Sequence, residues 1–256
     1  MRILLVNDDG IQAKGIQVLA NILAFKHEIY IVAPANEQSG KSHALTINMP
    51  LKVNTIKMSS PKITAYSVDG TPADCTKLAI EYLLDKQPDL IISGINNGFN
   101  LGTDVLYSGT VGAALEGYIH KIPAIAVSTS SKSAISLEEI ATIIADKLDI
   151  LYHSDNLFMY NINFPCKFHD NQPKFVFTKH GYRTYENEFE PLSLPDGSTA
   201  YRMQGRAKNI GNDETTDIHV VDKGFISITP LQIERTDFNK LTQIKNLGGI
   251  LNGIND

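Results

Sequence analysis

The sequence lacks several features that mark whole classes of protein. Its 256 residues contain no tryptophan and two cysteines, Cys75 and Cys166, with no CxxC pair and no metal-type spacing. This use of cysteine is typical of a reducing compartment. No window approaches the ~20 apolar residues of a membrane span, and the amino terminus has no charged segment followed by a long apolar run. We therefore expect a soluble, cytoplasmic protein that does not engage a membrane.

Positive charge is also scarce. The chain has 23 Lys and Arg against 28 Asp and Glu, which gives a net charge of -5 and a pI near 5.8. Affinity for nucleic-acid backbones rests on clustered Lys and Arg, so we expect no stable nucleic-acid complex. A small anionic substrate is compatible with this charge. The length and the 43% hydrophobic content suit one large domain with an ample core.

Familiar catalytic and nucleotide-binding motifs are missing as well. The sequence has no GxxxxGK[ST], and its first predicted strand-to-helix turn, NDDGIQAKG, has no GxGxxG. It has no G-x-S-x-G nucleophile turn and no HExxH pair. The seven histidines are scattered, and we interpret His43, His180 and His219 as surface or packing residues. These absences argue against P-loop, dinucleotide-binding, serine-hydrolase and zinc-hydrolase sites.

The apolar pattern that is present alternates between strand and helix. Arg2–Val6, Gly15–Phe25 and Glu28–Ala33 read as a βαβ unit. The alternation predicts further strands at 90–92, 122–128 and 159–164 and helices at 73–84, from about 110, and at 136–151. Extended segments at 44–56 and 62–68 suggest an antiparallel insertion. The pattern predicts a doubly wound α/β fold, followed from Pro173 by a strand-rich region without a clear linker.

The most informative stretch is MRILLVNDDGIQAKG at the amino terminus. The apolar run Arg2–Val6 stops at a polar turn that contains Asp8, Asp9 and Gly10. In open α/β sheets, ligands bind beyond the carboxyl ends of the strands. Two carboxylates that converge there repel each other, so either one takes up a proton or a cation lies between them. Taken alone, the stretch is explained more simply as a turn in which one Asp caps the next helix.

Oxygen-bearing side chains also follow two later predicted strands. Ser39 lies in the polar loop 35–42, and Asn96 lies in the turn after the strand at 90–92. Carboxylate, hydroxyl and amide oxygens suit Mg²⁺, Mn²⁺ or Ca²⁺ better than zinc. Taken singly, Ser39 and Asn96 are more typical of loop hydrogen bonds. Ser108-Gly109-Thr110 opens a predicted helix, where it is equally well explained as an anion site or as an ordinary capped helix start.

Five motifs in one order along the chain add a family resemblance. They are MRILLVNDDGIQAKGI at the amino terminus, Ser39-Gly40, SGINNGFNLGTDVLYSGTVGAALEG at 93–117, IPAIAVS at 122–128 and GFISITPL at 224–231. As a set they resemble the survival protein SurE family of metal-dependent nucleoside monophosphate phosphatases. The resemblance runs from Met1 to about Leu231. It implies one divalent metal ion per subunit, Mg²⁺ or Mn²⁺, held by Asp8, Asp9, Ser39 and Asn96.

The resemblance also has implications for architecture. It implies a single domain over 1–256, with a Rossmann-like core at 1–170 and an extension at 171–256 that exchanges between protomers in a homodimer or homotetramer. The segment Tyr201–Arg206 departs from the pattern, since many relatives carry an aromatic-rich stretch there. This departure leaves base preference and assembly state open.

We expect the protein to hydrolyse the phosphomonoester of nucleoside 5'-monophosphates, with 3'-monophosphates as a second candidate class. In this hypothesis the metal ion acts as a Lewis acid and activates a water molecule for in-line attack. Asp8 and Asp9 are the catalytic carboxylates, and Asp9 is the better candidate to orient or deprotonate the water. The phosphate would be held by Asn7, Gly40, Ser108, Gly109 and Thr110.

Two alternatives compete with this expectation. A covalent aspartyl-phosphate mechanism is typical of phosphatases with DxD spacing, whereas the carboxylates here are adjacent. A non-catalytic nucleotide sensor would use the same crevice to bind a monophosphate, and fold alone does not choose between the two uses. The pair of carboxylates beside a phosphate site favours the enzyme, because a pure binding module needs them only if a metal is present too.

Overall fold

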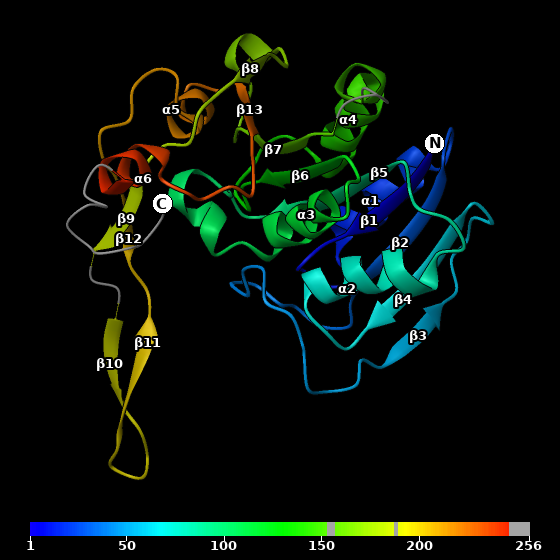
Figure 1. Cartoon of the computed structure of the whole chain (residues 1–256), viewed down its shortest axis with the longest axis horizontal. Coiled ribbons are helices and arrows are strands. Elements are labelled where there is room, and N and C mark those ends of the chain that lie inside the picture. Colours follow the sequence, from blue (N-terminus) through cyan, green and yellow to red (C-terminus); the bar gives the residue numbers. More distant parts are fainter. Residues whose placement is uncertain (153–156, 187–188, 246–256) are drawn as a thin grey trace.

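The computed structural model describes residues 1–152, 157–186 and 189–245. A nine-stranded sheet forms its centre, in the order β3-β4-β2-β1-β5-β6-β7-β13-β8 (Figure 1). On one side of β1 lie β2 (Glu28–Pro34), β4 (Ile63–Val68) and, at the edge, β3 (Val53–Ile56). On the other side lie β5 (Leu90–Asn97), β6 (Ala124–Thr129), β7 (Met159–Phe164), β13 (Ile226–Pro230) and β8 (Phe175–Phe177). The predicted α/β class is confirmed.

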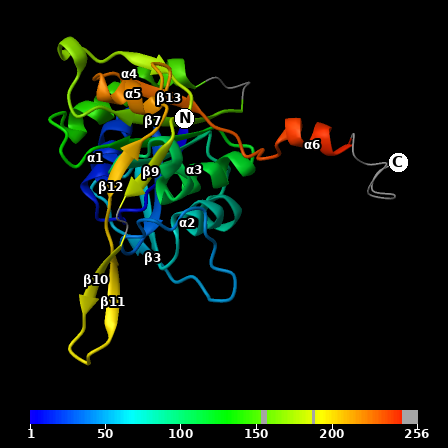
Figure 2. The ribbon, with the colours of Figure 1, turned by 90° about the vertical axis from the view of Figure 1, so that its left-hand side faces the viewer.

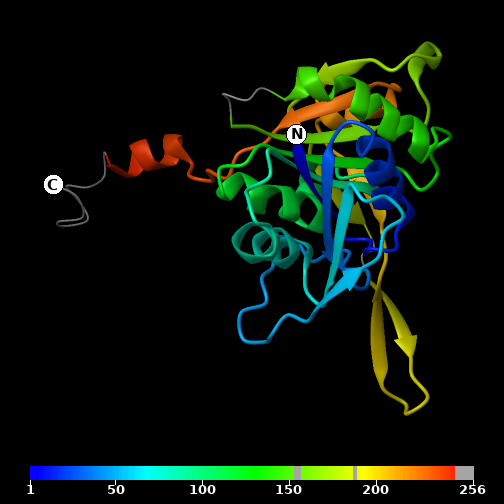
Figure 3. The same ribbon diagram turned by 90° about the vertical axis from the view of Figure 1, so that its right-hand side faces the viewer.

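Helices cover both faces of the sheet because each central strand is apolar on both sides. In β1 (Arg2–Val6), Ile3 and Leu5 enter one core cluster, while Leu4 and Val6 enter the other. The first cluster lies under α1 (Lys14–Leu23) and α4 (Leu137–Leu151). The second lies under α2 (Pro72–Leu78) and α3 (Gly109–Ile119). Figure 3 shows the layers from the side of the amino terminus.

The order of the strands creates a switch point at β1. The chain adds β2 on one side of β1, and later returns to add β5 on the other side, with both pairings parallel. Two pairings in this sheet are antiparallel, that of β3 with β4 at one edge and that of β13 with β7 near the other. In such sheets the crevice at the carboxyl ends of the strands next to the switch point binds ligands. The turn after β1 therefore lies where a ligand is expected.

Three predicted elements differ in detail. Of the extended segment at 44–56, only Val53–Ile56 forms a strand, since residues 35–52 take neither helix nor strand conformation. The predicted helix at 73–84 is α2 followed by a π-helical turn, η1 (Ala79–Leu83). The strand at 90–92 continues to Asn97, because β5 resumes its pairing with β6 at Asn96 after a register shift. Asn96 thus lies inside a strand and not in a turn.

The carboxyl-terminal region has two parts. Its strands β8 and β13 extend the central sheet, so the strand-rich tail does have a place there. Between them, β9 (Arg183–Glu186) and β12 (Arg206–Asn209) form the foot of an arm, and β10 (Phe189–Ser193) and β11 (Thr199–Met203) form its projecting hairpin (Figures 1 and 2). A helix that the pattern did not predict, α5 (Asp217–Asp222), follows the arm. Helix α6 (Phe238–Lys245) also projects from the body.

The arm leaves and re-enters the body at one point. Lys179 and Thr216 form an isolated parallel bridge, in which the Lys179 amide donates to Thr215 O at 3.0 Å and the Asp217 amide donates to Lys179 O at 3.0 Å. Within the described ranges, no helix is long and apolar enough to cross a membrane.

Candidate active site

Asp8 lies at the end of β1, on the face that α2 and α3 cover. Its side chain is 4% exposed, and its Oδ1 accepts a hydrogen bond of 2.5 Å from Thr110 Oγ1. Helix α3 approaches this carboxylate closely because it begins with glycine. A side chain at Gly109 would place its first carbon 3.0 Å from Asp8 Cβ and 3.1 Å from Asp8 Oδ2. The sequence thus brings the start of α3 directly onto the first carboxylate.

The loop after β2 is bound to the same turn through backbone hydrogen bonds. The Gln38 amide donates to Asp8 O at 2.7 Å, and the Ile11 amide donates to Pro34 O at 2.9 Å. Ser39, the next residue along, is exposed, and its hydroxyl donates to Glu37 Oε1 at 2.8 Å. The structure therefore brings the Ser39 loop to Asp8, as a site with shared ligands requires.

Asp9 is joined to the end of β5. Its Oδ2 accepts a hydrogen bond of 3.2 Å from the Asn97 amide. The neighbouring Asn96 is half-buried, and its Nδ2 donates to Gly98 O at 2.9 Å. Because the side-chain nitrogen donates to Gly98, the side-chain oxygen of Asn96 is the atom left for a ligand.

The two carboxylates of this site, Asp8 and Asp9, both have raised pKa values. Burial raises the pKa of Asp8 to about 6, against hydrogen bonds from Thr110 that lower it, and the charge of Asp9 raises it further. Burial also raises the pKa of Asp9, and the charge of Glu37 adds to this rise against the Asn97 hydrogen bond. The charge of Asp9 thus disfavours ionisation of Asp8, and the charge of Glu37 in the loop after β2 disfavours ionisation of Asp9. Perturbed pKa values in a crevice are typical of functional sites.

Asn7 adds an unsatisfied oxygen to this environment. Its side chain is fully buried, its Nδ2 donates to Gly10 O at 2.8 Å, and its Oδ1 has no hydrogen-bond partner. A buried acceptor without a donor is costly unless a ligand satisfies it. Its amide nitrogen, the atom that could donate to a phosphate, is engaged in the turn.

These observations test whether a divalent cation fits the site. The donors are all oxygens, two carboxylates have raised pKa values, and one buried amide oxygen lacks a partner. A hard cation would relieve each of these conditions. No group of three or more His, Cys, Asp or Glu side chains with metal-binding geometry occurs in the described residues, so the fit depends on hydroxyl and amide oxygens beside the two carboxylates.

Ser108 serves as the N-cap of α3. Its Oγ accepts a hydrogen bond of 3.1 Å from the Val111 amide. The hydroxyl is therefore engaged within the helix, which matches the capped-helix alternative. Capping does not exclude an anion site, because a helix N-terminus still presents backbone amides and the positive end of its dipole. Gly40 lies in the exposed Ser39 loop with a φ of 71°.

A cavity of about 410 Å³ opens beside Asp9, on the face that α1 and α4 cover. Hydroxyl side chains from the loop after β6 line it together with aliphatic side chains and two charged ones, Asp9 and Lys14. The lining includes Asp9, Lys14, Asn97, Ser131, Ser133, Ile95 and Leu137. Such a mixture of hydroxyl, amide, charged and aliphatic groups suits a polar small molecule.

Two asparagines of β7 that no sequence motif indicated hold the loop before Ser108. Asn163 on β7 accepts from the Asn100 amide at 2.9 Å and donates to Asn100 O at 3.0 Å. Asn161 donates to the same oxygen at 2.8 Å, and Asn100 Nδ2 donates to Ser128 Oγ at 2.8 Å. The signal was the alternation in MYNINF, which places two asparagines on one side of a buried strand.

Comparison with known proteins shows one consistent relationship. A family model described as survival protein SurE matches residues 3–187. A protein named 5'-nucleotidase SurE from Alkaliphilus metalliredigens is 42% identical over 250 residues, which cover 96% of this chain and 98% of that relative. One of the same name from Natranaerobius thermophilus is 43% identical over 258 residues and covers 96% and 98%. The crystal structure of the SurE protein from Aquifex aeolicus superposes with a TM-score of 0.78 at 36% identity, over 96% of this chain and 99% of that one.

Proposed function

Because the chain belongs to the SurE family, we propose that it is a phosphatase that hydrolyses nucleoside 5'-monophosphates to nucleoside and phosphate. The relatives named 5'-nucleotidase SurE align over nearly the whole chain, and this supports the reaction class. The observation in the structure that carries the proposal is the meeting of Asp8, Asp9 and the start of α3 at the switch point of the sheet. Nucleoside 3'-monophosphates are a second substrate class to test.

We propose that Asp8, Asp9, Ser39 and Asn96 hold one divalent cation, Mg²⁺ or Mn²⁺. The raised pKa values of the two carboxylates and the all-oxygen set of donors support this assignment. When bound, the cation supplies Lewis acidity toward the phosphate group.

The residues of the chain divide the remaining chemistry between them. The amides at the start of α3, with Ser108, Gly109 and Thr110, and the loop at Gly40 bind the phosphate oxygens. Asp9 orients the attacking water and accepts its proton as the water oxygen bonds to phosphorus and the bond to the nucleoside oxygen breaks, since its carboxylate is the less buried of the two. The proton held by Asp9 then passes to the departing nucleoside oxygen. Thr110 fixes the orientation of Asp8 through its hydroxyl. Asn7 shapes the turn and remains a predicted phosphate ligand.

The cavity beside Asp9 is our candidate for the nucleoside portion of the substrate. Its volume of about 410 Å³ lies within the range of small-molecule sites. Ribose hydroxyls would find donors and acceptors among the serines of the loop after β6. A base would lie against aliphatic side chains such as Ile95 and Leu137.

We further propose that the chain forms a homodimer or homotetramer through its extension. Large apolar side chains on the arm are exposed, including Phe189 at 57%, Tyr201 at 66% and Met203 at 75%. Helix α6 likewise exposes Phe238 and Ile244. Clustered exposure of this kind marks interaction surfaces. The single-domain division into 1–170 and 171–256 stays a proposal, and residues 246–256 lie outside the described part of the chain.

The first experiment measures phosphate release from a panel of nucleoside 5'- and 3'-monophosphates, with Mg²⁺, with Mn²⁺ and with a chelator. Asp9→Asn is run beside the wild type. We expect release that requires the metal and disappears in this variant. Asp149→Asn, which alters an exposed carboxylate on α4, is the matched control and should behave as wild type.

Two outcomes would contradict the proposal. Full activity in Asp9→Asn would remove this carboxylate from the mechanism. Tight nucleotide binding without turnover under any metal would instead favour the nucleotide sensor.

A further inference from the structure

The loop that carries Ser39 and Gly40 has no secondary structure of its own. Residues 35–52 contain neither helix nor strand, and Ser39 and Gly40 are exposed. A segment of this length keeps a fixed position only if its side chains and backbone are bound to the body. The contacts that bind it therefore decide where Ser39 and Gly40 lie relative to the phosphate site.

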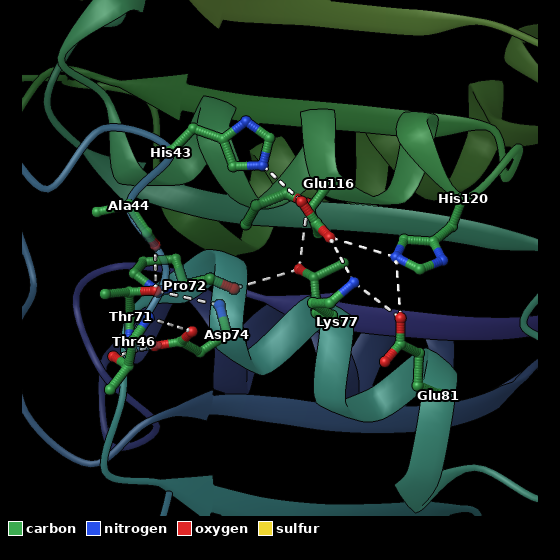
Figure 4. A network of polar contacts seen from close by, with 12 residues as sticks. His43, Ala44, Thr46, Thr71, Pro72, Asp74, Lys77, Glu81, Glu116 and His120 are labelled. Carbon is green, nitrogen blue, oxygen red and sulfur yellow. Dashed lines mark hydrogen bonds and ion pairs between the residues drawn. The ribbon is translucent and has the colours of Figure 1, made fainter. Parts of the chain in front are cut away.

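One such contact joins the loop to a buried carboxylate on α3. His43 Nε2 lies 2.7 Å from Glu116 Oε2 (Figure 4). The side chain of Glu116 is 5% exposed, and that of His43 is 24% exposed. A charged group that is nearly buried needs partners, and an ionic hydrogen bond of this length is among the stronger kinds.

Glu116 is fixed from its other side. Its Oε1 lies 3.2 Å from His120 Nε2 on the same helix and 3.6 Å from Lys77 Nζ on α2 (Figure 4). Burial alone would raise the pKa of Glu116, but the hydrogen bond and charge of His43, with Lys77 and His120, lower it. The carboxylate is thus a charged anchor that the body holds in place, and His43 is its single partner from the loop.

The backbone beside His43 also presses onto α3. The Ser42 amide donates to Tyr107 O at 3.0 Å, and Ser42 Oγ donates to Leu106 O at 2.6 Å. Helix α3 has a glycine where the loop crosses it, and a side chain at Gly112 would come within 2.4 Å of Ser42 O. The loop and the start of α3 therefore share one tight contact, next to the residues assigned to the phosphate.

The far end of the loop is held independently. Thr46 donates to Asp74 from its amide at 2.9 Å and from its hydroxyl at 2.6 Å, and Thr71 Oγ1 donates to Ala44 O at 2.7 Å. Loss of the His43 contact would leave these bonds to α2 in place. Its effect is therefore expected on the side of the loop that carries Ser39 and Gly40, where the Ser42 contacts and the hydrogen bond from the Gln38 amide to Asp8 O remain.

We propose that His43 is a positioning residue, which through Glu116 holds the Ser39 and Gly40 loop at a fixed distance from the Ser108 to Thr110 turn. The two halves of the phosphate site come from separate segments, and this contact joins them across α3. The consequence for catalysis rests on the function proposed above, whereas the consequence for the loop does not. The scattered histidines of the sequence suggest that His43 is a surface or packing residue. In this proposal it also positions the loop that carries Ser39 and Gly40.

The chain offers a matched control. His43 and His120 contact the two oxygens of the same carboxylate, but only His43 belongs to the loop. We would compare His43→Ala, His43→Gln and His120→Ala by hydrogen exchange of peptides that span residues 36–50. The same proteins are assayed for KM, kcat, half-saturating Mn²⁺ concentration and thermal unfolding midpoint.

We expect His43→Ala to raise exchange in the loop, KM and the half-saturating Mn²⁺ concentration by roughly tenfold each, as befits the loss of one hydrogen bond to a charged group. The change in kcat should be smaller, and the unfolding midpoint should fall by only a few degrees, because Lys77 and His120 still contact the Glu116 carboxylate. His43→Gln, which can still donate to Glu116, should recover part of the effect. His120→Ala should leave the loop unchanged.

Unchanged exchange in the loop of His43→Ala would overturn the proposal, as would an equal effect from His120→Ala. If the wild type released no phosphate from any nucleotide, the proposed function would fail, and hydrogen exchange alone would still decide whether His43 holds the loop.

Discussion

The carboxyl edge of the central sheet and the projecting arm differ in which side chains they bury and which they expose. At the edge of the sheet, polar groups are buried, as in Asp8 and Asn7, and are tied to neighbouring loops by hydrogen bonds. On the arm, apolar groups are exposed, as in Tyr201 and Met203. Both arrangements cost free energy in the isolated chain, since neither a buried charge nor exposed apolar surface is favourable there. In the function proposed above, a cation and substrate offset the first cost and a second copy of the chain offsets the second.

The largest effect on activity is expected from a substitution at Asp8, the buried carboxylate of the sheet edge. We expect Asp8→Asn to lower phosphate release on the order of 10³-fold, because one of the two carboxylates proposed to hold the cation beside the phosphate is lost. The variant should nonetheless be more stable than wild type without metal at pH 8, because Asn keeps the contact with Thr110 and removes a buried charge. Activity assays and thermal unfolding of one preparation test both statements. A variant that is both inactive and less stable would show that the carboxylate supports the fold.

The second effect concerns pH. The pKa of Asp8 is about 6 in the folded protein and about 3.9 in an unfolded chain, so between pH 4 and pH 6 the folded state holds a proton that the unfolded state has released. The free energy of unfolding of the metal-free protein should therefore fall by about 3 kcal/mol as the pH rises through this window. Denaturant titrations at several pH values would measure it, and Asp8→Asn should lack this fall.

Divalent cations should act in the opposite direction. They bind the deprotonated carboxylates, so the rise in unfolding midpoint that Mn²⁺ causes should be larger at pH 7.5 than at pH 5. An equal rise at both pH values would mean that Mn²⁺ binds elsewhere.

A smaller effect is expected in the cavity beside Asp9. Ser131 lines this cavity, and Ser131→Phe should fill part of it. KM for a nucleoside monophosphate should rise by roughly tenfold, about 1.4 kcal/mol of lost binding, while KM for a small phosphomonoester such as glycerol 2-phosphate should not change. A parallel rise for both substrates would place the nucleoside elsewhere.

The smallest effect on folding is expected on the arm. Tyr201→Ser with Met203→Ser should change the free energy of unfolding of the monomer by less than about 0.5 kcal/mol, because both side chains are mostly exposed. Light scattering should show that the variant no longer assembles, while the wild type does. An assembly that survives the two changes would assign the contact to another surface, such as α6.

The sequence alone predicts the core well because its strands are buried on both faces. The runs at Arg2–Val6 and Met159–Phe164 have one plausible conformation, and the structure has strands at those residues. The conformation of the loop 44–52 and the presence of α5 could not be predicted from the sequence, since both depend on contacts with distant residues. The Thr46 contact with Asp74 and the hydrogen bond from the Gly102 amide to Asp217 are examples that no local pattern reveals.

The candidate site divides in the same way. The sequence could propose Asp8, Asp9, Ser39 and Asn96 because each lies after a recognisable apolar strand, and the resemblance joined them into one predicted set of ligands. The contacts of Glu37 and Glu116 could not be found, because the charge of Glu37 acts on Asp9 across the fold and Glu116 contacts His43, which is 73 residues away in the chain.

Because Lys179 and Thr216 are bridged, the arm is an insertion that begins and ends at one place on the body. Beyond its foot, the arm can grow, shrink or change sequence without altering the path of any strand in the central sheet, because it starts and ends at the same place. The proposed subunit contact on the arm and the proposed site at the carboxyl edge of the sheet therefore occupy separate stretches of the chain. We expect that shortening the hairpin of the arm would alter assembly without moving the turn that carries the two aspartates.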